Sequence, residues 1–135
     1  MGIILDSSLL IAFKVKNDFH HERAQALMRE VAGEMHGKPL VTDYIFDETV
    51  TGIFVRSKDL RLAVEYGKEL LASLDVLRID EQIFHQAWKI FSEQEKRELS
   101  FTDSTTLAAM KSNDISKIGT FDRDFREIEQ IELIS

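Results

Sequence analysis

The stretch Gly2-Ile-Ile-Leu-Asp6 indicates the fold class of this sequence. It is a short apolar run with β-branched residues that ends at a carboxylate, which is the pattern of a strand buried on both faces. Strands of this kind belong to parallel sheets, whose two faces are covered by helices. The rest of the chain is therefore expected to alternate helices with further short strands.

The hydrophobic pattern beyond this strand shows that alternation. Apolar residues recur at helical spacing from Ala24 to Met35, and Gly37-Lys38-Pro39 ends the pattern before a second strand. The expected elements, in order, are strand 2–6, helix 24–35, strand 40–42, a helix 45–54 capped by Asp43, a helix from Asp59 to Leu74, strand 76–79, helix 83–91, an exposed segment 93–98, a helix capped by Thr102 and running to Met110, strand 115–120 and strand 131–134. This order predicts an α/β fold, a three-layer sandwich with a mostly parallel central sheet.

Length and composition indicate one globular domain over residues 1–135. Hydrophobic residues make up 44% of the chain and charged residues 30%, which is average for a soluble domain with a single core. The longest apolar run, Leu9 to Phe13, is far shorter than the roughly 20 residues of a membrane helix. We therefore expect no membrane segment and a cytoplasmic location. The absence of cysteine excludes disulfides, zinc–thiolate sites and thiol nucleophiles.

The charge balance narrows the function classes. The 17 Lys and Arg residues against 24 Asp and Glu residues give a net charge of -7. This balance argues against a duplex-DNA binder that relies on neutralising phosphates. It still permits an enzyme that meets a polyanion through a bound cation, because the carboxylates that bind the cation themselves lower the net charge.

Four acidic residues are expected to meet at one edge of the sheet, because ligands bind at the carboxyl ends of strands in open α/β sheets. They are Asp6 at the end of the first strand, Glu48 one turn into the helix after the second, Asp103 at the start of the helix before the fourth, and Asp122 just after the fourth. Taken singly, each is more simply a turn, cap or surface residue. Together they would repel one another without a divalent cation, so the set predicts a hard-cation site.

The residues around these acids resemble the PIN domain family. The resemblance spans nearly the whole chain, and the length looks most like that of VapC-type toxins of prokaryotic toxin-antitoxin pairs. It rests on Ile3-Ile-Leu-Asp6-Ser-Ser, Asp47-Glu48-Thr49, Phe101-Thr-Asp103 leading into Leu107-Ala-Ala-Met110, and Thr120-Phe-Asp122-Arg-Asp-Phe125.

The resemblance implies an endoribonuclease that depends on Mg²⁺ or Mn²⁺. It implies three partners, namely an RNA substrate, an antitoxin protein and a second copy of the chain in a homodimer, for which the apolar helices 45–54 and 60–74 leave a face. The implied catalytic and metal-binding residues are Asp6, Glu48, Asp103 and Asp122, with Asp124 as a further candidate at a position that varies in the family, and with Ser7 and Thr120 as polar supports.

Three alternatives remain open at this point. One is a PIN nuclease that processes RNA without a toxin role, and another is an inactive PIN-like module that binds RNA or protein. The third is a phosphoacceptor receiver domain, in which Asp80 would be the phosphoacceptor and Lys117 its lysine. Against a receiver domain, the first strand ends in one acid rather than an adjacent pair.

Overall fold

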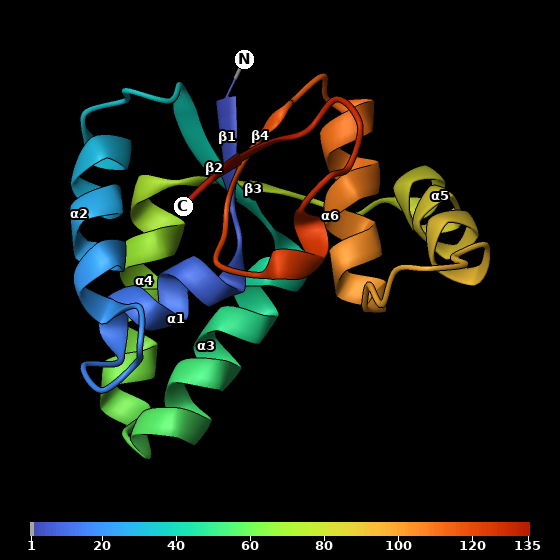
Figure 1. The fold of residues 1–135 in the computed structure, drawn as a ribbon. Helices are drawn as coiled ribbons and strands as arrows, with labels where there is room; N and C mark the ends of the chain where they lie inside the picture. Colours follow the sequence, from blue (N-terminus) through green and yellow to red (C-terminus); the bar gives the residue numbers. More distant parts are fainter. Residues whose placement is uncertain (1) are drawn as a thin grey trace.

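The computed structural model describes residues 2–135 and shows an α/β fold around one parallel sheet (Figure 1). The five strands lie in the order β3-β2-β1-β4-β5, and every neighbouring pair is parallel. The strands are β1 (Gly2–Leu5), β2 (Lys38–Thr42), β3 (Asp75–Leu77), β4 (Lys117–Gly119) and β5 (Glu132–Ile134). The predicted fold class and the mostly parallel sheet are confirmed.

The central strand is buried on both faces, as its sequence predicts. Ile3, Ile4 and Leu5 of β1 are inaccessible to solvent, and Ile4 pairs with Leu40 of β2 on one side and Ile118 of β4 on the other. An apolar strand with no polar face must be covered from both sides, so helix layers form above and below it.

Six α-helices supply these two layers. They are α1 (Ser7–Lys14), α2 (His21–Ala32), α3 (Asp43–Ser57), α4 (Leu60–Ser73), α5 (Glu81–Ser92) and α6 (Phe101–Ser112), with a short 3₁₀ helix η1 (Arg123–Phe125) before β5. The chain moves from β1 through β2 to β3 in one direction, so right-handed crossovers place α1 to α4 on one face. It then returns to β4, which places α5 and α6 on the opposite face (Figure 1).

This reversal fixes the position of a cleft. Strands β1 and β4 are neighbours, but the connections that leave β1 and enter β4 run on opposite faces of the sheet. Their carboxyl ends therefore diverge at a topological switch point, which is where open α/β sheets bind ligands. Asp6 follows β1 and Asp122 lies three residues beyond β4, so two of the predicted acids border this point.

Several predicted boundaries were wrong. The helix α1 was missed, because Leu9 to Ala12 form an apolar run without the polar residues that give a helical period. The helix predicted to reach Met35 ends at Ala32, since Glu34 adopts a left-handed conformation that breaks it, and Met35 is exposed. The third strand covers residues 75–77 rather than 76–79.

Two predicted helix caps were also wrong, each by one or two residues. Thr42, and not Asp43, caps α3, with its hydroxyl accepting a hydrogen bond from the Ile45 amide. Ser100, and not Thr102, caps α6.

Among residues 2–135, no helix is long and apolar enough to cross a bilayer.

Candidate metal centre

Asp6 is the fixed point of the site. It is 4% exposed, and its Oδ2 accepts hydrogen bonds from the Ser8 hydroxyl at 2.8 Å and the Thr120 hydroxyl at 2.7 Å. Ser8 follows β1 and Thr120 follows β4, so the two hydroxyls bring the ends of neighbouring strands onto one carboxylate. Two donors on one oxygen hold the Asp6 carboxylate in a single orientation.

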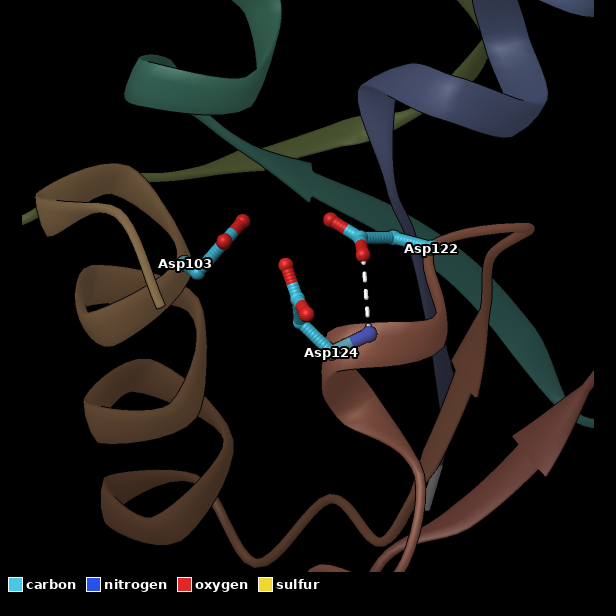
Figure 2. A group of neighbouring side chains, drawn as sticks. All are labelled: Asp103, Asp122 and Asp124. Carbon is cyan, nitrogen blue, oxygen red and sulfur yellow. Dashed lines mark hydrogen bonds between the residues drawn. The ribbon is translucent and has the colours of Figure 1, made fainter. Parts of the chain in front are cut away.

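The same hydroxyls shape the loop after β4. The Ser8 hydroxyl accepts a hydrogen bond from the Phe121 amide at 3.0 Å, and the Thr120 hydroxyl accepts one from the Asp122 amide at 2.9 Å. Asp122 then accepts a hydrogen bond from the Asp124 amide at 2.9 Å, which caps η1 (Figure 2). The loop therefore carries two carboxylates, Asp122 and Asp124, near Asp6. Hydrogen bonds to Ser8, just after β1, and to Thr120, just after β4, hold this loop in place.

Asp103 enters the site from the other face of the sheet. It is the third residue of α6 and closes a capping box, because the Ser100 hydroxyl accepts from the Asp103 amide at 3.0 Å and Asp103 Oδ2 accepts from the Ser100 amide at 3.1 Å. This pair of bonds fixes where the helix begins and thus where Asp103 stands.

Glu48 belongs to the same site but has a different support. It lies on α3, half-buried, and its Oε1 accepts a hydrogen bond from the Ser7 hydroxyl at 3.0 Å. The first two residues of α1 therefore serve different acids, with Ser7 bonded to Glu48 and Ser8 bonded to Asp6.

Three of the carboxylates can meet on one ion. Oxygen atoms of Asp103, Asp122 and Asp124 lie within 4.8 Å of one another. Figure 2 shows them pointing toward a common point between α6 and the loop after β4. Carboxylate oxygens are the ligands that hard divalent cations prefer, and few protein ligands leave coordination positions for water and phosphate.

Burial and mutual repulsion raise the pKa values of these acids. The pKa of Asp103 rises to about 7, first because of burial and then because of the nearby Asp6 and Asp122 charges, although the Ser100 bonds oppose the rise. Burial likewise raises the pKa of Asp122, with Asp124 and Asp6 adding to the effect. The pKa of Glu48 is also raised, chiefly by burial.

The negative charge of the five acids is not balanced by close ion pairs in the part of the chain that the structure describes. Within residues 2–135, no Lys, Arg or His forms an ion pair with any of the five acids. A cluster of partly buried carboxylates without cationic partners is costly to ionise, and a divalent cation would remove that cost. The donor set of this structure therefore fits a bound divalent metal.

The structure brings the five acids implied by the family resemblance to one edge of the sheet. Asp103, Asp122 and Asp124 form the closest group, Asp6 lies near Asp103 and Asp122, and Glu48 lies near Asp6. The predicted support Thr120 bonds to Asp6, whereas Ser7 bonds to Glu48. The sequence analysis missed Ser8, which bonds to Asp6 two residues before it and also to Thr120 and the Phe121 amide, more than a hundred residues away. Only the bond to Asp6 is local enough to be suggested by the sequence.

The comparison with family models identifies the fold. The model of the PIN domain matches residues 3–131. The chain belongs to the PIN domain family. The resemblance seen in the sequence is thus confirmed, and the receiver alternative is wrong. Asp80 of that alternative is an exposed cap of α5, where its Oδ1 accepts from the Ile83 amide at 2.9 Å.

Solved PIN structures align over nearly the full chain. VapC20 of Mycobacterium tuberculosis, described as a sarcin-ricin loop cleaving toxin, gives a TM-score of 0.82 at 26% identity and covers 92% of both chains. VapBC2 of Rickettsia felis bound to a promoter DNA fragment gives 0.72 at 12% identity over 99% of this chain and 98% of that chain. DNA-bound VapBC of Salmonella typhimurium gives 0.71 at 18% identity over 99% and 97%. No curated protein matches the chain.

Proposed function

We propose that this PIN domain is a divalent-metal-dependent endoribonuclease and the toxin of a VapBC-type pair that acts in the cytoplasm. The observation that carries the proposal is the convergence of Asp103, Asp122 and Asp124 oxygens within 4.8 Å at the switch point of the sheet. The similarity to a VapC toxin at 26% identity supports RNA as the substrate. That relative is described as a sarcin-ricin loop cleaving toxin, so the sarcin-ricin loop is the first substrate to test.

The five acids of the site would have different roles in catalysis. Asp103, Asp122 and Asp124 would hold Mg²⁺ or Mn²⁺, which when bound would polarise a substrate phosphate and lower the pKa of a coordinated water. Asp6 would add a further negative charge next to the metal, and the Ser8 and Thr120 hydroxyls would hold its carboxylate in place. Glu48 would orient water on the α3 side of the site, because Ser7 fixes one of its oxygens.

The first of two apolar surfaces suits the antitoxin. Helices α3 and α4 enclose a groove of about 330 Å³, and exposed apolar residues line it, namely Phe54, Leu60, Val64 and Leu71. Apolar grooves between helices commonly bind an amphipathic helix of a partner protein. Several of the similar structures are toxin-antitoxin complexes, which supports an antitoxin as a partner; its place in this groove rests on the exposed apolar residues alone.

The second apolar surface suits another copy of the chain. Phe84, Trp88 and Phe91 follow one face of α5 at helical spacing, and Trp88 is 55% exposed. They pack at their base on Phe101, with ring centroids 5.1–6.4 Å apart. We assign the predicted homodimer to this face rather than to α3 and α4, because aromatic residues are enriched in the cores of protein interfaces.

Metal titration tests the proposed activity without knowledge of the RNA target. Wild type should bind Mn²⁺ in calorimetry, and Asp6→Asn and Asp122→Asn should weaken binding at least tenfold, because each removes a charge from the cluster. Asp47→Asn is the matched control, since Asp47 precedes Glu48 on α3 but is exposed. A wild type that binds no Mn²⁺ would contradict the metal site.

Cleavage and growth assays then separate the remaining alternatives. A toxin should arrest growth when expressed in bacteria, and Asp122→Asn should abolish the arrest. An RNA-processing enzyme should cleave RNA in a metal-dependent manner without arresting growth. An inactive module should do neither.

A further inference from the structure

We propose that Arg97 is a positioning residue that holds the two halves of the acid cluster at metal-binding distance. This inference rests on the proposed function, since it concerns the geometry of the same site. Arg97 touches none of the carboxylate groups; it acts through the backbone that carries them.

The guanidinium of Arg97 binds the main chain of the loop after β4. One terminal nitrogen donates to the carbonyl oxygens of Arg126 at 2.8 Å and Asp124 at 3.5 Å, and the other donates to the carbonyl of Glu127 at 2.7 Å. Asp124 lies within η1, Arg126 and Glu127 follow it, and Glu127 adopts a left-handed conformation with φ 60° that turns the chain. A planar guanidinium has five donors on three nitrogens and can bind several carbonyls at once, whereas a lysine has three donors on a single nitrogen.

The segment that carries Arg97 is itself held in shape. The side chain of Gln94 accepts a hydrogen bond from the Leu99 amide at 2.8 Å and donates to the Leu99 carbonyl at 3.0 Å, which closes residues 94–99 into a loop. Leu99 is buried and anchors that loop to the core. Ser100 follows directly and fixes Asp103 through the capping box. Arg97 therefore lies in an exposed loop whose far end leads directly into the residue that caps α6.

Arg97 thus joins two segments that approach the metal centre from different directions. One is the connection between α5 and α6, which sets the place of Asp103, and the other is the loop that carries Asp122 and Asp124. Within residues 2–135, the three Arg97 bonds are the only hydrogen bonds between residues 93–100 and residues 121–131. A cavity of about 1190 Å³ lies between these parts of the chain, so apolar packing does not fill the space.

The mechanical consequence concerns the cluster itself. Without a cation, the repulsion among Asp103, Asp122 and Asp124 would favour separation of the loop from α6, and the capping bond between Asp122 and Asp124 acts only within the loop. The Arg97 bonds oppose this separation. They keep the carboxylates within 4.8 Å before an ion arrives, which lowers the ordering cost of binding.

The test compares Arg97→Ala with Lys96→Ala, which removes the same charge from the neighbouring residue of the same loop. Lys96 is exposed and makes no hydrogen bond or ion pair within residues 2–135, so it controls for electrostatics. We expect Arg97→Ala to weaken Mn²⁺ binding about tenfold in calorimetry, Arg97→Lys to be intermediate, and Lys96→Ala to stay within twofold of wild type. We also expect amides of residues 122–128 to exchange faster with deuterium in metal-free Arg97→Ala.

Each outcome decides a separate point. Equal Mn²⁺ affinity in Arg97→Ala and Lys96→Ala overturns the positioning role, and so does unchanged hydrogen exchange in residues 122–128. If wild type binds no Mn²⁺, the proposed metal-dependent function fails, and the exchange measurement still decides whether Arg97 holds the loop. If Arg97→Ala does not fold, Arg97→Lys takes its place in both measurements.

Discussion

At the scale of the residue, the ionised carboxylate of Asp103 lowers the stability of the metal-free fold, because it is partly buried near other acids. Its pKa of about 7 in the fold lies above the usual value of an aspartate, so the fold favours its protonated form. The contribution of Asp103 to the free energy of unfolding is therefore fully present below about pH 4, where the carboxyl is protonated, and is lost as the pH rises through about 7. An asparagine at this position keeps the acceptor oxygen of the capping box and carries no charge at any pH.

We expect Asp103→Asn to be more stable than wild type at pH 8 in a chelator, by about 1–2 kcal/mol once solvent screening is allowed for. At pH 4 the two proteins should be about equally stable, since both are then neutral at this position. Urea unfolding at the two pH values measures the difference, with the exposed Glu95→Gln as control. An equal advantage at both pH values would contradict the role of charge.

At the scale of the element, the sequence predicted features that have a clear local pattern and missed features without one. The order of the strands along the chain and the acids at their ends could be found, because a buried strand and a terminal carboxylate are local patterns. The helix α1 could not, since its apolar run is continuous. The bond between Ser8 and Thr120 could not either, because the two residues lie 112 positions apart.

The two adjacent serines of α1 allow these roles to be separated. Ser8→Ala removes a donor from Asp6 and an acceptor from the Phe121 amide, so it should destabilise the fold by about 1–2 kcal/mol and weaken Mn²⁺ binding. Ser7→Ala removes only the bond to Glu48 and should leave the loop after β4 intact. Unfolding in urea and Mn²⁺ titration compare the two; equal effects would show that Ser8 has no special link to the metal centre.

At the scale of the whole molecule, two apolar surfaces are left uncovered by the chain itself. Helices α3 and α4, which form the apolar groove, lie on one face of the sheet, and α5, which carries the exposed aromatic residues, lies on the other; Figure 1 shows the places of these helices. Exposed apolar surface of this kind marks sites of protein association. Because the surfaces are on opposite sides of the sheet, an antitoxin in the groove and a second copy on α5 would not compete.

The position of the homodimer can be tested without the antitoxin. Trp88→Lys places a charge at the centre of the α5 face and should convert a dimer to a monomer in light scattering after gel filtration, because an unpaired charge in an apolar interface is costly. Val64→Lys makes the same change in the groove of α3 and α4, where Val64 is 46% exposed, and should leave the dimer intact. The reverse result would place the dimer on α3 and α4, as the sequence analysis expected, and would leave the α5 face to another partner.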